Sequence, residues 1–152
     1  MKLHKAGALA RSRSLLLVAL LAAPFDLSFA QGGPTPAPAN AYAYIGYPNN
    51  GETMPAGKPF RVWFGLRFMG VAPRGVKFPN TGHHHLLVDT DLPPLDQEIP
   101  SDRNHLHYGA GETEAMIELP PGKHTLQLLM GDDRHIPHNP PIYSKKITIY
   151  VK

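Results

Sequence analysis

The sequence contains no cysteine among its 152 residues. This absence excludes disulfide bonds, Fe–S clusters, thiolate ligands for zinc or copper, a cysteine nucleophile and a lipid-modified N-terminal cysteine. A stable fold must therefore come from the burial of apolar side chains rather than from covalent cross-links.

The sequence also lacks an apolar run long enough to span a membrane. The run from Leu15 to Ala23 has nine residues, whereas a membrane-spanning helix needs about 20. Basic residues precede this run, and Ser28-Phe29-Ala30 follows it with small residues at the two positions that a signal peptidase reads. We therefore expect residues 1–30 to be a cleaved signal peptide. The mature protein is then expected to be periplasmic or secreted, with no stable membrane insertion.

The expected mature chain has no excess of basic residues. Residues 1–30 hold four of the 15 Lys and Arg residues and one of the 12 Asp and Glu residues, so 11 of each sign remain. The sequence pI of about 9.2 belongs largely to the precursor. Charge therefore gives no support for a nucleic-acid partner, and none is expected.

No segment shows sustained helical periodicity. Residues 31–40 are rich in Pro, Gly and Ala and are expected to form a disordered leader before a single domain at 41–152. In that domain, short segments of alternating apolar and polar residues are separated by Pro/Gly turns, which predicts strands. They lie near residues 42–47, 60–68, 83–88, 114–119, 123–130 and 147–151. This pattern predicts an all-β fold, an antiparallel β-sandwich of immunoglobulin-like or cupredoxin-like type.

Two finer expectations follow from the same alternation. The turn Pro120-Pro121-Gly122 is expected to join its flanking strands as a hairpin. The inward-facing residues are expected to form one core between two sheets, comprising Phe60, Phe64, Leu86, Val88, Ile117, Leu126, Leu128, Ile147 and Ile149.

Eight of the nine histidines lie between positions 83 and 138. Residues i and i+2 of a strand project from the same face, about 6.5–7 Å apart, so two His-x-His pairs could converge on one ion. An all-nitrogen site suits Zn or Cu. The predicted metal ligands are His83, His85, His105 and His107, with His84, His135 and His138 as further candidates. Acceptors that could orient these rings are Asp89, Asp132 and Asp133.

Two other interpretations remain open for these histidines. They could form a hydrogen-bonded structural network in a non-metal binding or interaction module, whose ligand would be an unidentified periplasmic partner. Alternatively, the paired motifs loosely resemble those of copper–zinc superoxide dismutases, which would imply a copper-dependent redox enzyme, although the disulfide of that family cannot form here. His124 shares a face with Leu126 and Leu128, which favours a structural role over metal ligation.

Four motifs resemble a group of exported bacterial domains of unknown function. They are Gly82-His-His-His-Leu-Leu-Val-Asp89, His105-Leu-His-Tyr-Gly109, Leu119-Pro-Pro-Gly-Lys-His-Thr-Leu126 and Gly131-Asp-Asp-Arg-His-Ile-Pro137. The resemblance extends over about residues 42–152. It implies an exported all-β domain with histidines at these positions, and it implies no particular substrate or activity.

Overall fold

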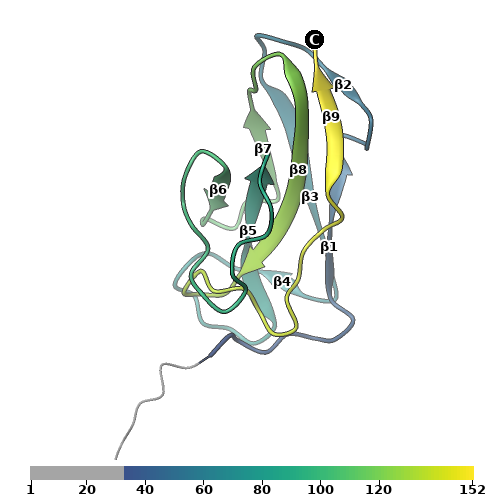
Figure 1. Cartoon of the computed structure of the whole chain (residues 1–152). Helices are drawn as coiled ribbons and strands as arrows, with labels where there is room; N and C mark the ends of the chain where they lie inside the picture. Colours follow the sequence, from purple (N-terminus) through teal and green to yellow (C-terminus); the bar gives the residue numbers. More distant parts are fainter. Residues whose placement is uncertain (1–32) are drawn as a thin grey trace, which may run out of the picture.

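The computed structural model describes residues 33–152, which form nine β-strands and no helix (Figure 1). The expected signal peptide, residues 1–30, lies outside the described residues. Within the described part of the chain, no helix is long and apolar enough to cross a membrane.

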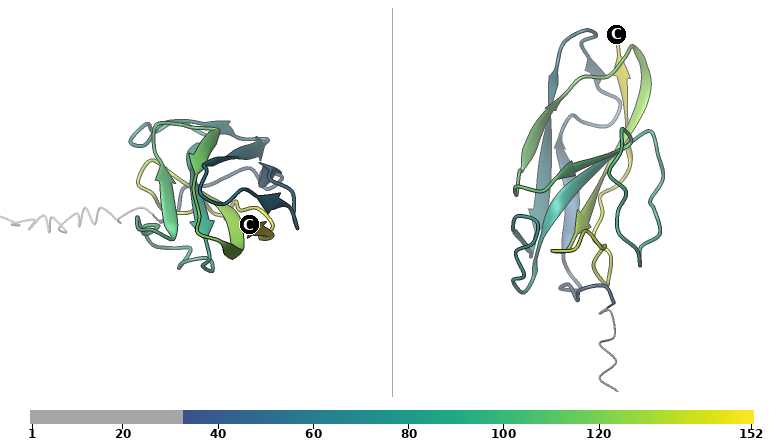
Figure 2. Two further views of the ribbon diagram at one scale, coloured as in Figure 1. Left: turned by 90° about the horizontal axis from the view of Figure 1, so that it is seen from above. Right: turned by 90° about the vertical axis from the view of Figure 1, so that its left-hand side faces the viewer.

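Two β-sheets pack face to face (Figure 2). The smaller sheet has the order β1 (Tyr42–Tyr47), β3 (Phe60–Arg67), β7 (Glu114–Ile117), and both pairings are antiparallel. Its inner face carries Phe60, Val62 and Phe64 of β3, while Arg61, Trp63 and Arg67 point outward. The alternation seen in the sequence is therefore the alternation of the two faces.

The larger sheet has the order β2-β9-β8-β5-β4, and β6 also pairs with β5. The strand bounds are β2 (Thr53–Met54), β4 (Gly70–Val71), β5 (Thr81–Val88), β6 (His105–Tyr108), β8 (Gly122–Gly131) and β9 (Ile147–Val151). The long pairings of β8 with β5 and β9 are antiparallel, and the short strands β2 and β4 add in parallel. The predicted all-β sandwich is confirmed, with two short parallel pairings added to it.

The expected hairpin through Pro120-Pro121-Gly122 is wrong. β7 pairs with β3 in the smaller sheet, whereas β8 pairs with β5 and β9 in the larger one. The connection therefore crosses from one sheet to the other. A Pro-Pro-Gly turn fixes a change of direction, but it does not determine which sheet the next strand joins.

The core between the sheets contains the predicted set of residues. Eight of the nine are buried, and Ile147 is partly buried against them. Val62, Met130 and Val151 add to the same core. The predicted faces of the strands are thus confirmed, including that of β5, where His84 faces inward beside Phe64 with a ring-centroid distance of 5.3 Å.

Part of the Pro/Gly-rich leader has definite contacts. Ala37 N–H donates to the Asn139 carbonyl, and Asn139 N–H donates to the Thr35 carbonyl. Residues from Thr35 onward therefore lie along the segment that follows β8. The composition of residues 31–40 predicts disorder, yet Thr35 and Ala37 within this segment make backbone hydrogen bonds to Asn139.

Candidate metal centre

The candidate site lies on the outer face of the larger sheet. His83, His85 and Leu87 point outward from β5, yet all three are buried. Loops 89–104 and 131–143 cover this face, and Ile99 of the first loop packs against Leu87 and Leu129. The two loops are joined by a hydrogen bond from Ile99 N–H to the His135 carbonyl.

Four histidine rings converge beneath these loops. His83 and His85 come from β5, His107 from β6, and His135 from loop 131–143. Each can offer one ring nitrogen so that the four nitrogens all lie within 4.8 Å of one another. The ring centroids of every pair are 4.4–5.7 Å apart. One ion could reach all four imidazoles.

The structure brings together three of the four predicted ligands and leaves His105 outside. In the antiparallel pairing of β5 and β6, His107 lies opposite His85, and His105 lies opposite Leu87. Leu87 is four residues from His83, which corresponds to about 13 Å along a strand. The His105 ring instead contacts the Asp102 carboxylate through Nδ1 at 3.0 Å.

The fourth position is occupied by His135, which the sequence indicated only as a further candidate. Its backbone has a φ of +66°, an uncommon conformation for a residue other than glycine. The turn that carries it is built around Asp132, whose carbonyl accepts a hydrogen bond from His135 N–H at 3.0 Å. The sequence signal was the Gly-Asp-Asp-Arg-His stretch in a long loop, but nothing in that signal gives the loop's position.

The ring nitrogens of the cluster have almost no hydrogen-bond partners in the protein. Six of them are buried and unpartnered: both nitrogens of His83, both of His85, and Nε2 of His107 and His135. A buried polar atom without a partner costs about 1–3 kcal/mol. The cluster therefore destabilises the folded state unless a ligand binds these nitrogens.

Each of the remaining histidines from residue 84 onward has at least one ring nitrogen bonded to a neighbouring group, while Nε2 of His84 and Nδ1 of His138 are buried without a partner. His84 Nδ1 lies 3.0 Å from the Glu112 carbonyl, and His138 Nε2 lies 3.1 Å from the Thr81 carbonyl. His124 contacts the Asp89 carboxylate at 2.6 Å and the Pro120 carbonyl at 2.8 Å. The structural role predicted for His124 fits these contacts.

The acidic residues expected to orient the metal ligands act elsewhere. Asp89 bonds His124, and the Asp132 carboxylate accepts from the backbone N–H groups of Arg134 and Ile136. The carbonyl of Asp133 accepts from Gly75 N–H. The carboxylate of Asp132 therefore shapes the loop that carries His135 and is not bonded to an imidazole.

Burial keeps the clustered imidazoles neutral. Burial, together with a smaller effect of the neighbouring histidines, lowers the pKa of His83 to about 4 and that of His85 to about 2. Burial also lowers the pKa of His107 and of His135, and the Arg74 guanidinium adds to both shifts. Metal ligation requires neutral imidazole, so at neutral pH these rings are in the form that binds a metal.

Comparison with known protein families matches residues 62–152 to a domain of unknown function, DUF4399. The chain belongs to the DUF4399 family. No curated protein and no solved structure matches it. All four clustered histidines of this DUF4399 protein lie within the matched residues.

The ligand set of the DUF4399 domain restricts the chemistry of the site. Four neutral nitrogen ligands suit Zn²⁺, at about 2.0–2.1 Å, and tetragonal Cu²⁺. Ca²⁺ and Mg²⁺ prefer oxygen ligands, and the cluster offers only imidazole nitrogens. Around a tetrahedral ion with these bond lengths the nitrogens would be about 3.3 Å apart, and on opposite sides of a tetragonal ion about 4.1 Å, so the four nitrogens must move closer together to hold the ion.

Proposed function

We propose that this protein binds one transition-metal ion, Zn²⁺ or Cu²⁺, through His83, His85, His107 and His135. The observation that carries the proposal is the convergence of four buried imidazoles from three separate segments, with nitrogens within 4.8 Å of one another. The expected signal peptide supports a periplasmic or secreted location for this metal-binding role.

The contrast between histidines in the same molecule favours a metal over a hydrogen-bonded network. A structural network would bond its ring nitrogens to carbonyls and carboxylates, as His124 does on both sides. The rings of His83 and His85 are fully buried and bond to nothing. Buried polar groups are almost always satisfied in proteins, and a metal ion would satisfy one ring nitrogen of each of these histidines.

Of the four clustered histidines, His107 is the least buried. This residue is half-buried and lines a surface hollow together with Asp102 and Glu118. The two carboxylates give the hollow a negative charge that attracts cations.

Four protein ligands favour capture or storage of the ion over catalysis. A catalytic zinc keeps one coordination position for water or substrate, whereas a site with four protein ligands is filled. The proposed role is therefore to capture or buffer the metal. A tetragonal copper site would still have axial positions, so superoxide turnover by the copper-loaded protein is the measurement that would favour the redox-enzyme alternative.

Calorimetric titration with Zn²⁺ and with Cu²⁺ tests the proposal. We expect one ion per chain, and loss of that binding in His107→Ala and in His135→Ala. His105→Ala is the matched control, because it removes a histidine two residues from His107 that lies outside the cluster; its binding should equal that of the wild type. Weak uptake at several sites that both ligand variants leave unchanged would contradict the proposal and favour a structural histidine network.

A further inference from the structure

The position of His135 depends on a turn that Asp132 holds in place. The side chain of Asp132 is almost fully buried. Its Oδ1 accepts hydrogen bonds from the backbone N–H groups of Arg134 at 2.8 Å and Ile136 at 3.0 Å, on either side of His135. Asp132 N–H also donates to the Ile136 carbonyl at 2.8 Å, closing the turn.

The second oxygen of the same carboxylate is bound by the N-terminal segment. The Thr35 hydroxyl donates to Asp132 Oδ2 at 2.6 Å, and the Arg134 guanidinium donates to that oxygen and to the Gly33 carbonyl, both at 3.0 Å. Thr35 lies 97 positions before Asp132 in the sequence. One carboxylate thus joins the start of the described chain to the turn that presents the fourth metal ligand.

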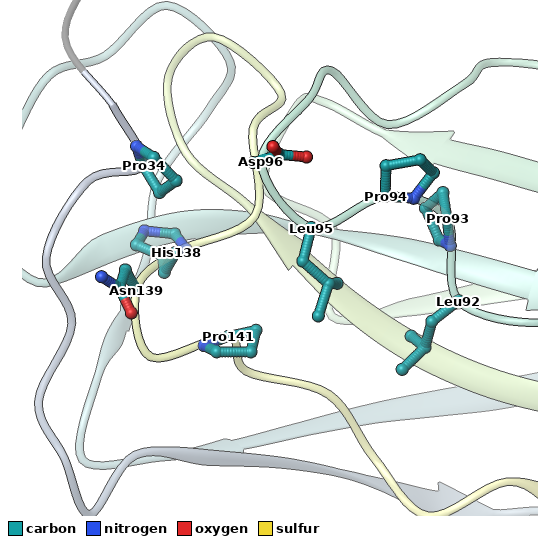
Figure 3. A pocket seen from close by; sticks show the side chains of 9 residues that line it. All are labelled: Pro34, Leu92, Pro93, Pro94, Leu95, Asp96, His138, Asn139 and Pro141. Carbon is teal, nitrogen blue, oxygen red and sulfur yellow. The ribbon is translucent and has the colours of Figure 1, made fainter.

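Further contacts fix this segment along the metal-binding loop. Thr35 and Ala37 exchange backbone hydrogen bonds with Asn139, at 3.0 and 3.1 Å. Figure 3 shows Pro34 near His138 and Asn139 at one side of a surface pocket, with Leu95 and Asp96 of loop 89–104 across from them. The start of the described chain and loop 131–143 lie at the same end of the molecule (Figure 1).

We propose that residues 33–37 act as a strap that positions His135, so that the docking of this segment against loop 131–143 determines the affinity of the site for metal. The inference rests on the proposed metal binding. A loop residue with a positive φ keeps that conformation only while its surroundings hold it. Thr35 is then a positioning residue, because it acts on the ligand through Asp132 and does not contact the ion.

The coupling must be reciprocal. If the seated strap strengthens metal binding, the bound metal strengthens the seating of the strap by the same factor. The amide hydrogens of Ala37 and Asn139, which donate within the strap contact, should therefore exchange with solvent more slowly when metal is bound. A purely structural role of Thr35 would not make these amides respond to metal.

Two substitutions of Thr35 separate the effect of its hydroxyl group from the effect of its side-chain shape. Thr35→Val removes the donor to Asp132 and should weaken Zn²⁺ and Cu²⁺ binding about 10- to 100-fold, the usual effect of losing a group that orients a metal ligand. Thr35→Ser keeps the donor and should bind within about twofold of the wild type. Thr148→Val, on β9, is the matched control and should leave affinity unchanged.

The experiment combines metal titration of these full-length variants with hydrogen exchange on the wild type, with and without Zn²⁺. The strap proposal is overturned if Thr35→Val binds metal as tightly as the wild type, or if the exchange rates at Ala37 and Asn139 do not change with metal. Either result leaves the metal site itself intact. No uptake of metal by the wild type overturns both proposals. The exchange measurement needs only the wild type, so it decides the question even if Thr35→Val does not fold.

Discussion

At the scale of single residues, glycines make room for histidine rings. A Cβ added at Gly109 would lie 2.3 Å from His107 Cε1, and one at Gly131 would lie 2.8 Å from His85 Cε1. Both distances are far shorter than a van der Waals contact between carbon atoms, about 3.5–4.0 Å. Neither glycine could carry a side chain unless the imidazole moved.

We predict that Gly109→Ala displaces the His107 ring and weakens metal binding by at least tenfold while the domain stays folded. The φ of Gly109 is not in the left-handed region, so alanine strains the ring and not the backbone. Titration with Zn²⁺ measures the loss, and urea unfolding of the metal-free variant checks the fold. Gly65→Ala is the matched control, since its Cβ would crowd Tyr44 within the smaller sheet, away from the histidine cluster; equal losses in both variants would contradict the prediction.

The limits of prediction from sequence are clearest at His105 and His135. Alternation correctly places His83 with His85 on one face and His84 on the other, because burial imposes a period of two on a strand. Alternation carries no information on register, and register moves His105 beside Leu87. His135 lies in no strand, and the turn that carries it is bonded to Asp132, whose contact with Thr35 no local pattern reveals.

At the scale of elements, one ion pair joins the end of β5 to the start of β8. The Asp89 carboxylate accepts from the His124 ring and from Thr125 N–H. Both partners of the His124 ring, Asp89 and the Pro120 carbonyl, are acceptors, so both contacts are hydrogen bonds when the ring carries a proton on each nitrogen. Burial alone would lower the pKa of His124, but the hydrogen bonds to Asp89 and Pro120 outweigh it and raise the pKa.

The raised pKa predicts a pH-dependent contribution to stability. A histidine whose pKa is higher in the folded state stabilises the fold fully below the unfolded pKa of about 6.5, and this contribution is lost as pH rises through the folded value. His124→Gln should therefore cost about 1–3 kcal/mol at pH 5.5 and clearly less at pH 9. Urea unfolding of both proteins at the two pH values measures the difference; an equal cost at both would show that the ring is neutral in the fold.

Strand boundaries were more predictable than strand partners. The alternation of Ile147, Ile149 and Val151 with polar residues predicts a strand at 147–151, and β9 has these bounds. The partners of β7 were predicted wrongly, because pairing depends on which edge of which sheet is open, and Pro120-Pro121-Gly122 is compatible with either sheet. Local chemistry indicates where the longer strands lie but not the two-residue strands β2 and β4, and the packing of distant segments determines how the strands are joined.

At the scale of the whole molecule, the proposed ion would hold together β5, β6 and loop 131–143. A ligand that binds only the folded state stabilises it by about 2.7 kcal/mol at a free concentration of 100 times Kd. We predict that Zn²⁺ or Cu²⁺ raises the urea midpoint of the wild type by the corresponding amount and that a chelator reverses the rise. His107→Ala should show no such rise, and a metal-independent midpoint in the wild type would contradict the prediction.

The position of β9 in the larger sheet has a consequence for how the domain folds. β9 follows every other described strand in the sequence, yet it lies inside the sheet between β2 and β8. The connection after β1 depends on it as well: Thr148 N–H donates to the side chain of Asn50, 98 residues earlier. Until residues 147–151 are in place, β8 has an open edge and β2 has no partner. A chain in that state can pair with other chains, so the larger sheet is protected at this edge only once β9 has joined it.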